Sequence, residues 1–132
     1  VHTAIHSAPL SPVAHLDAKD WSRSMSINVD ALSYLIPFIS PLLGLEGRAV
    51  FFDDTHAGEK FFGCYGTTKA AQIALARSWQ NETVSTGPKV KILSPAPMAT
   101  HVRGRFFPGE DRTGLATAPE EAARILPDIL SD

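Results

Sequence analysis

A tyrosine and a lysine stand four residues apart in the stretch CYGTTKAAQIALARSW, which spans residues 64–79. A tyrosine hydroxyl has an ordinary pKa of about 10 and is a poor acid or base at neutral pH. A nearby ammonium favours the phenolate and lowers that pKa. Residues four apart share one face of a helix, so Lys69 can lie beside Tyr65 if this stretch is helical. The pair then predicts a proton donor or acceptor suited to carbonyl and alcohol chemistry.

The same pair has a purely structural interpretation. A tyrosine at the start of a helix commonly packs against a core, and a lysine one turn later commonly points to water. The spacing also arises easily by chance in a chain with two tyrosines and five lysines. The spacing alone leaves both interpretations open, so the position of the pair in the fold has to decide between them.

Strand-like and helix-like patterns alternate along the chain. Short apolar runs at 1–5, 48–54 and 89–95 predict three buried strands. Helical stretches separate them, which implies right-handed β-α-β units. The fold class predicted is therefore α/β, a three-layer parallel sheet of about three strands with helices on both faces.

Helix boundaries are marked by capping residues and breakers. Asp17 and Asp20 supply N-cap chemistry for a helix over 21–43, and Pro37 and Pro41 predict a kink or an early stop within it. The remaining elements are a helix over 65–82, a loop over 96–117 and a last helix that starts at Thr117.

Several polar residues gather where the strands end. In parallel sheets the ligand site lies beyond the carboxyl ends of the strands. Tyr65 follows the second strand, and Thr55 offers a hydroxyl at the end of that strand. Asn28 lies in the middle of a predicted helix, where an asparagine is costly unless it makes a specific hydrogen bond.

Four features together resemble the short-chain dehydrogenase/reductase family: the Tyr65/Lys69 pair, Thr55 in DDTHAG, Asn28 in SINVDA, and the stretch SPAPMAT after the third strand. The resemblance covers essentially the whole chain, as the second half of a Rossmann-like fold. It implies a cytoplasmic oxidoreductase that transfers hydride between NAD or NADP and a carbonyl or alcohol. The stretch RGRFFPGED at 103–111 is similar to a poorly characterised bacterial branch, in which this loop covers the substrate.

The resemblance also implies roles for individual residues. Tyr65 matches the general acid/base, and Lys69 matches the lysine that lowers the tyrosine pKa and binds the nicotinamide ribose. Thr55 matches the serine that holds the substrate oxygen, and Asn28 matches the asparagine that supports a proton-relay water. The cofactor-binding residues that it implies are Tyr65, Lys69, Pro95, Ala96 and Thr100.

Other positions depart from the family pattern. Residues 2–5 read His-Thr-Ala-Ile where the family has Asn-Asn-Ala-Gly, and Asp53 and Asp54 stand where small residues are common. Ala96 replaces a glycine. These departures favour an alternative hypothesis, a catalytically silent relative that acts as an oligomerisation or binding module.

The dinucleotide-binding half of the fold has no counterpart in these residues. The chain contains no Gly-rich turn of the dinucleotide type, and in the family that turn would precede Val1. We therefore interpret residues 1–132 as a single domain, the C-terminal half of the fold, and expect no dehydrogenase activity from it alone. The choice between NAD and NADP stays open.

Composition limits the partners. A net charge of −2 and a pI near 6.2 give no reason to expect nucleic acid or a polybasic membrane contact. The single Cys64 suits packing, and the five histidines lack metal-ligand spacing, so no metal is expected. The expected partners are a small-molecule carbonyl or alcohol and further copies of the chain, as a homodimer or homotetramer through the two long helices.

Overall fold

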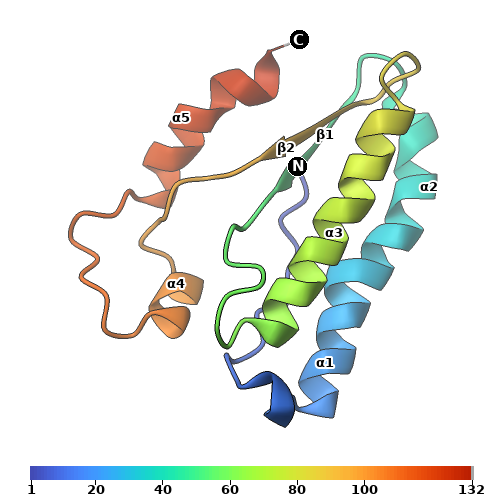
Figure 1. Ribbon diagram of the computed structural model, residues 1–132. Coiled ribbons are helices and arrows are strands. Elements are labelled where there is room, and N and C mark those ends of the chain that lie inside the picture. Colours follow the sequence, from blue (N-terminus) through green and yellow to red (C-terminus); the bar gives the residue numbers. More distant parts are fainter. Residues whose placement is uncertain (132) are drawn as a thin grey trace. The chain divides into compact units, whose positions relative to one another are not determined.

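The computed structural model describes residues 1–131 and divides the chain into two compact units (Figure 1). The first unit spans Val1–Ser94 and the second begins at Pro95. The first unit contains the Tyr65/Lys69 pair.

In the first unit a long helical segment follows the N-terminal stretch and the short 3-10 helix η1 (Val13–His15). This segment comprises α1 (Ala18–Met25), a π-helical turn η2 (Ser26–Asp30) and α2 (Ala31–Leu43). The carboxylate of Asp17 caps its start by accepting bonds from the backbone N–H of Lys19 and Asp20, at 2.9 and 3.0 Å, as predicted. Its end lies at Gly44, whose φ of 60° favours glycine.

Of the two outcomes predicted at Pro37 and Pro41, a kink or an early stop, the early stop is wrong. Both prolines lie inside α2, which continues to Leu43. Packing explains this outcome, because the helix places Leu32 in the core and packs Ile36 and further apolar residues against it. Tertiary packing of an apolar face commonly overrides local propensity.

The sheet contains two parallel strands among the described residues. β1 (Arg48–Phe52) pairs with β2 (Lys89–Leu93). The predicted strand over 1–5 is wrong, since this segment contributes one backbone bond to the sheet, from His2 N to Val50 O at 2.8 Å. The segment then leaves the sheet, because the backbone of His6 bonds the side chain of Asn28 instead.

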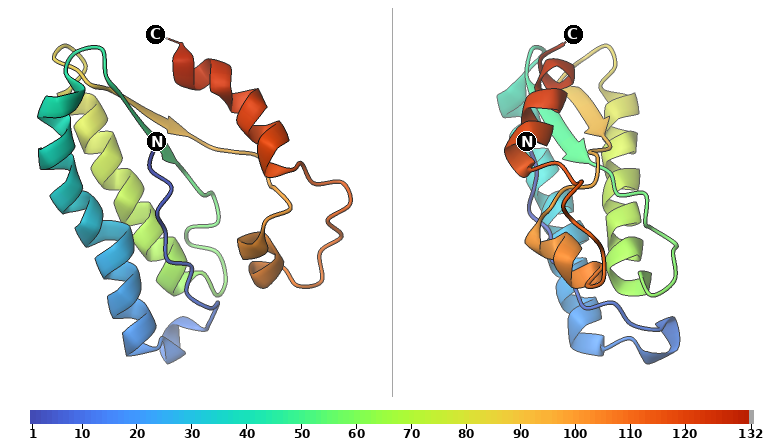
Figure 2. Two further views of the ribbon diagram at one scale, coloured as in Figure 1. Left: turned by 180° about the vertical axis from the view of Figure 1, so that it is seen from behind. Right: turned by 90° about the vertical axis from the view of Figure 1, so that its left-hand side faces the viewer.

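Helix α3 (Gly63–Glu82) makes the crossover between the two strands. Both views in Figure 2 place α3 alongside the α1–α2 segment. The two helical segments pack on the sheet around Leu32, Phe51 and Trp79, and the rings of Phe51 and Trp79 meet edge to face at 6.3 Å. The remaining members of this core are Ala49, Ile73, Ala76 and Val90.

The second unit consists of two helices and their connections. Helix α4 (His101–Phe106) lies within the stretch 96–117 that was predicted as a loop, and Thr100 caps it. Helix α5 (Ala118–Leu130) has Thr117, the predicted start, as its N-cap, with a capping box between Thr117 and Glu120.

One helical stretch is long and apolar enough to span a membrane by length and composition, Ala18–Leu43 with a mean hydropathy of 1.3. It includes η2, where the buried side chain of Asn28 lies, and Leu32 of the core. A single helix of this kind is weak support for a membrane span, because the core helix of a soluble protein passes the same test.

Candidate functional site

Close packing positions the start of α3 against the loop that follows β1. A Cβ atom added to Gly66 would lie 3.1 Å from the Cα of Ala57 and 3.3 Å from the Cβ of Phe62. Glycine therefore allows the loop to approach the first turn of the helix. Phe61, just before that turn, adopts a φ of 72°, a strained value for a bulky residue.

The hydroxyl of Tyr65 donates a hydrogen bond to Oδ2 of Asp54 at 2.9 Å. The other oxygen of the same carboxylate accepts from the backbone N–H of His56 at 3.0 Å and contacts its ring Nδ1 at 2.6 Å. The ring of His56 stacks on Phe62 at 5.3 Å, and Phe62 meets Tyr65 edge to face at 6.3 Å. Tyr65 is thus joined to a half-buried carboxylate that is itself fixed by a histidine.

The pKa of Tyr65 is raised, whereas the sequence led us to expect that Lys69 lowers it. Burial, followed by the charge of Asp54 and the hydrogen bond to it, raises the pKa of Tyr65 above its ordinary value. Burial acts to raise the pKa of Asp54, but the hydrogen bonds from His56 and Tyr65 outweigh it and lower that pKa. The structure therefore pairs a protonated phenol with an ionised carboxylate at neutral pH.

Lys69 is buried, with 8% of its surface exposed, and its ammonium donates to Oε1 of Gln72 at 2.9 Å. Burial lowers the pKa of Lys69, against the charges of Asp54 and Asp53, which act to raise it. An ammonium carries three donors, and the bond to Gln72 uses one of them.

Asn28 is fully buried and its side chain is bonded on both atoms, as its position in a helix led us to expect. Its Oδ1 accepts from His6 N at 2.6 Å, and its Nδ2 donates to His6 O at 3.0 Å and to Thr68 Oγ1 at 2.9 Å. Its backbone carbonyl accepts from Nε2 of Gln72 at 3.0 Å. The π-helical turn around Asn28 is a feature that often marks functional sites.

Three of the four predicted catalytic residues lie in one hydrogen-bond network, and the fourth, Thr55, is exposed. Tyr65, Lys69 and Asn28 belong to one network, since Gln72 bonds both Lys69 and Asn28, and Thr68 of the same helix bonds Asn28 and the carbonyl of Tyr65. Thr55 itself is exposed. Asp54, the residue before Thr55, accepts the hydrogen bond of the Tyr65 hydroxyl.

Sequence reasoning missed Asp54, His56 and Gln72 as members of this site. It treated Asp54 only as a departure from the family pattern. The sequence did contain a signal for Asp54, because two acids follow a buried strand next to the expected site. A carboxylate in such a place needs a hydrogen-bonding partner. Nothing in the local sequence pointed to Gln72.

The residues expected to bind cofactor in the second unit are held within that unit. Ala96 follows Pro95, and its backbone N–H donates to Oε1 of Glu121 at 2.7 Å. The hydroxyl of Thr100 accepts from the backbone N–H of Arg103 at 3.2 Å and so caps α4. The side chain of Arg103 donates from Nε to Glu110 at 2.7 Å, which ties down the loop that the resemblance placed over the substrate.

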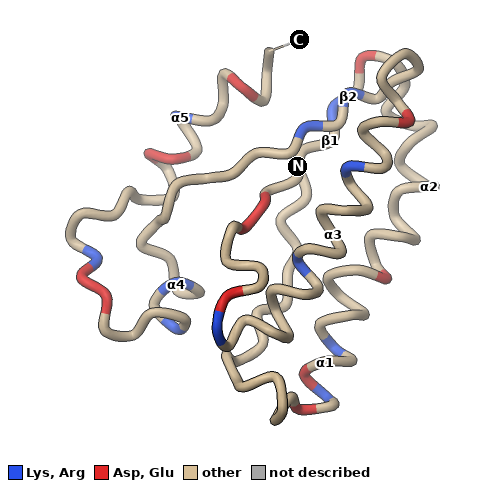
Figure 3. Tube along the Cα trace, viewed as in Figure 1, with Lys and Arg blue, Asp and Glu red and all other residues tan. Residues whose placement is uncertain are grey.

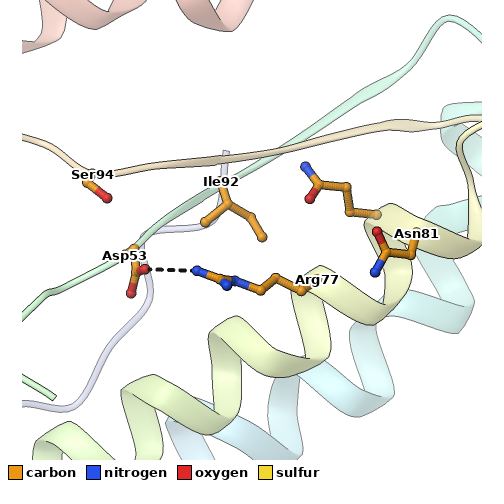
Figure 4. Close-up of a pocket in the computed structure, with 6 residues that line it drawn as sticks. Asp53, Arg77, Asn81, Ile92 and Ser94 are labelled. Carbon is orange, nitrogen blue, oxygen red and sulfur yellow. Dashed lines mark ion pairs between the residues drawn. The ribbon is translucent and has the colours of Figure 1, made fainter. Parts of the chain in front are cut away.

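A hollow of about 410 Å³ lies between the sheet and α3, away from these residues (Figure 4). Figure 4 shows Asp53 and Arg77 pointing toward one another, and their charged groups are 3.6 Å apart. The remaining lining residues are Gln80, Asn81, Ile92 and Ser94. The hollow therefore includes neither Tyr65 nor Lys69.

The donor set around Tyr65 fits a nicotinamide cofactor. Lys69 presents a buried ammonium and Tyr65 a hydroxyl on one helix face, groups that can bond the hydroxyls of a ribose. No group of three or more His, Cys, Asp or Glu residues with the arrangement of a metal site occurs in residues 1–131.

A parallel β-α-β unit with a polar set at the carboxyl end of its strands defines a Rossmann-like α/β protein. The comparisons with known proteins give the family. The model of the family described as short chain dehydrogenase matches residues 2–111, and the chain belongs to that family.

Two similar curated proteins are dehydrogenases. The chain is 30% identical to the 2-keto-3-deoxy-L-fuconate dehydrogenase of Xanthomonas campestris, over 88% of this chain and 45% of that protein. It is 27% identical to a dehydrogenase of Cochliobolus heterostrophus, over 89% of this chain and 57% of that protein. The chain thus spans about half the length of the curated relatives that it matches.

Solved structures share the fold. A short chain dehydrogenase from Salmonella enterica superposes with a TM-score of 0.87 at 25% identity, covering 99% of this chain and 55% of that one. A short chain dehydrogenase from Shigella flexneri, complexed with NADP, superposes with a TM-score of 0.86 at 24% identity, covering 99% of this chain and 56% of that one. These matches confirm the Rossmann-like fold class.

Proposed function

We propose that the chain supplies the proton-transfer part of an NAD- or NADP-dependent dehydrogenase site, acting on a small carbonyl or alcohol. The observation that supports this most directly is the burial of Tyr65 and Lys69 at the start of α3 together with Asn28 of η2, which Thr68 and Gln72 link into one network. In this proposal Tyr65 exchanges a proton with the substrate oxygen. Thr55 is retained as a contact of that oxygen on the resemblance alone.

The nicotinamide cofactor, when bound, takes or gives the hydride. Lys69 and Tyr65 would bond its ribose, and Pro95, Ala96 and Thr100 are proposed as further cofactor contacts. Asn28 would hold α3 in place next to Lys69, because its side chain bonds both Thr68 of α3 and the backbone of His6. We retain the interpretation of residues 1–132 as the C-terminal half of such a domain and a cytoplasmic location, both on the family resemblance.

Binding of reduced nicotinamide mononucleotide to the 132-residue chain tests this function. This probe carries the nicotinamide and its ribose but lacks the adenosine half. We expect NMR shift changes centred on Tyr65 and Lys69, lost in Lys69→Met and kept in Lys19→Met, which changes an exposed lysine of α1. Shift changes that spare α3, or that persist in Lys69→Met, would count against the proposal.

A second candidate function, an oligomerisation module, rests on the surface of α2. Tyr34, Phe38 and Leu42 are 70%, 74% and 83% exposed. Figure 3 shows no charged residue along α2, and the sequence has none from Ala31 to Leu45. Exposed apolar patches of this kind mark interaction sites. We propose that α2 and α3 mediate a homodimer or homotetramer, an arrangement compatible with either function.

A further inference from the structure

Gln72 places a polar side chain in the interior of the first unit. It lies in α3, three residues after Lys69, and 1% of its surface is exposed. Side chains three residues apart are neighbours on one helix face, so the amide of Gln72 can reach the end of the Lys69 side chain. A buried amide is costly unless its polar atoms are hydrogen-bonded. The partners of this amide therefore indicate its role.

The two ends of the Gln72 amide have partners of opposite character. Its Oε1 accepts from the ammonium of Lys69 at 2.9 Å, and its Nε2 donates to the backbone carbonyl of Asn28 in η2 at 3.0 Å. An ammonium can only donate, and a carbonyl can only accept. A flipped amide would set donor against donor and acceptor against acceptor. The partners therefore fix one orientation, with the acceptor end of Gln72 toward Lys69.

A third contact holds the donor end of the amide. Nε2 of Gln72 lies 3.4 Å from Nε2 of His2, whose ring contacts that of Phe51 at 5.7 Å. Burial, followed by the charge of Lys69, lowers the pKa of His2, which favours the neutral ring at neutral pH. A neutral ring with its proton on Nδ1 offers Nε2 as an acceptor for the second N–H of Gln72. The amide is thus held from the N-terminal segment, from η2 and from α3.

The ammonium of Lys69 needs such a partner because it ends a flexible four-carbon side chain. Ordering a lysine side chain costs conformational entropy, and Lys69 is 8% exposed. Gln72 uses one of the three donors of the ammonium and leaves the others for the ribose hydroxyls. Since Gln72 also bonds the backbone of η2, the position of the ammonium is set relative to two helical segments.

We infer that Gln72 is a positioning residue that fixes the Lys69 ammonium relative to the backbone of η2 and so prepares it to bind the ribose of the nicotinamide cofactor. The inference rests on the proposed function. Tyr65 and Lys69 keep the roles that they have in that proposal. Gln72 acts on the ribose only through Lys69, so its effect must be visible first in the ammonium itself.

Other groups also act on the ammonium of Lys69. Burial lowers its pKa, and the charges of Asp54 and Asp53 act to raise it. The titratable side chains around Lys69 and its amide partner are His2 of the N-terminal segment, Asp53 and Asp54 after β1, and Tyr65 of α3. A substitution of Gln72 leaves all of them in the chain, so a change in the titration of Lys69 reports on the amide.

The titration of Lys69 in the 132-residue chain tests the inference without a cofactor. The chain has five lysines, and after ¹³C labelling at Cε the NMR signal that is absent from Lys69→Met belongs to Lys69. We expect Gln72→Met to lower the midpoint of Lys69 by about 1 pH unit, because the ammonium loses an acceptor. Gln72→Glu should raise the midpoint by about 1–2 pH units, because an adjacent carboxylate favours the ammonium.

Gln80 provides the matched control. It lies in the same helix, is partly buried, and donates from Nε2 to the backbone carbonyl of Val90 at 2.7 Å. Gln80→Met therefore removes a comparable amide without touching the partner of Lys69, and the midpoint of Lys69 should not move. A midpoint that moves as far in Gln80→Met as in Gln72→Met overturns the inference. So does a midpoint that fails to move in opposite directions in Gln72→Met and Gln72→Glu.

A second measurement, with Gln72 intact, covers the case in which its variants do not fold. The chain has two glutamines, so the glutamine side-chain amide signal that remains in Gln80→Met belongs to Gln72. This signal should move with the midpoint of Lys69, because Oε1 of Gln72 loses a charged donor when the ammonium is deprotonated. An amide signal of Gln72 that ignores the titration of Lys69 overturns the inference.

Binding of reduced nicotinamide mononucleotide separates this inference from the proposed function. Gln72→Met should weaken binding by about 3–10-fold, because the ammonium loses its fixed position, whereas Gln80→Met should leave binding unchanged. Equal affinities of Gln72→Met and the unaltered chain overturn the inference. If the unaltered chain binds no nucleotide while Lys69 titrates as expected in the Gln72 variants, only the proposed function is contradicted.

Discussion

The hydroxyl of Tyr65 and the carboxylate of Asp54 are joined by a hydrogen bond of 2.9 Å across eleven residues of sequence. The bond connects the first turn of α3 to the end of β1, so it depends on the path of the intervening loop. That loop passes close to Gly66, and the helix beyond it is fixed through Asn28. Changes at these points are expected to alter the site in measurable ways.

Replacement of Gly66 by alanine is expected to displace the loop from the helix. The added Cβ would lie 3.1 Å from the Cα of Ala57, a backbone atom that cannot rotate away. We expect a loss of about 1–3 kcal/mol in the free energy of unfolding, measured with urea, together with shift changes at Tyr65. Gly109→Ala is the control, because nothing lies within 4 Å of its added Cβ. If Gly66→Ala instead stabilises the chain, as alanine does in an unobstructed helix, the proposed close approach is wrong.

Replacement of Asn28 by alanine is expected to be strongly destabilising. The change removes three hydrogen bonds and leaves the N–H and C=O of His6 without their partner in a partly buried place. Because these groups lose their hydrogen-bonding partners, we expect the free energy of unfolding, measured with urea, to fall by about 2–4 kcal/mol. Asn81→Ala, at an exposed position of α3, should change stability by less than about 0.5 kcal/mol. Equal effects of the two variants would contradict the assigned network.

Replacement of Phe38 by glutamate is expected to reduce self-association. Phe38 is 74% exposed on the uncharged surface of α2, and a charge there must be desolvated in any interface that covers it. Sedimentation velocity should show a smaller average mass for Phe38→Glu than for the unaltered chain. Val84→Glu, at an 80% exposed position outside α2, should leave the mass unchanged. Dissociation by Val84→Glu alone would place the interface elsewhere.

The second unit is expected to lose stability in acid through Glu121. Hydrogen bonds from Arg124 and from the backbone of Ala96 lower the pKa of Glu121 from 4.5 to about 2. Because the pKa is lower in the folded state, this contribution is complete above about pH 4.5 and is lost as the pH falls toward 2.

Comparison of the unaltered chain with Glu121→Gln by urea unfolding measures this contribution. The difference in the free energy of unfolding should be largest at neutral pH and should shrink below about pH 4.5. Glu59→Gln changes an exposed loop residue and serves as the control. A difference for Glu121→Gln that is constant with pH would exclude the assigned role of this carboxylate.

The sequence by itself determined the elements whose signals are local. Asp17 and Thr117 mark helix starts because a short polar side chain bonds the first free N–H groups of a helix, and both cap their helices in the structure. The apolar runs within 48–54 and 89–95 predicted two parallel strands, and β1 and β2 are confirmed. The pattern around Tyr65, Lys69 and Asn28 was sufficient to indicate the family, which the match over residues 2–111 confirms.

Only the tertiary structure decided which groups these residues meet. Local spacing placed Lys69 beside Tyr65, but the loop after β1 brings Asp54 to the Tyr65 hydroxyl and Gln72 receives the Lys69 ammonium. The same holds for residues 1–5, which were expected to form a strand. They form none, and the backbone of the next residue, His6, bonds the side chain of Asn28. Periodicity reports on steric and hydrophobic preferences within a few residues, whereas hydrogen-bond partners and burial, which set the pKa of Tyr65, depend on segments that folding brings together.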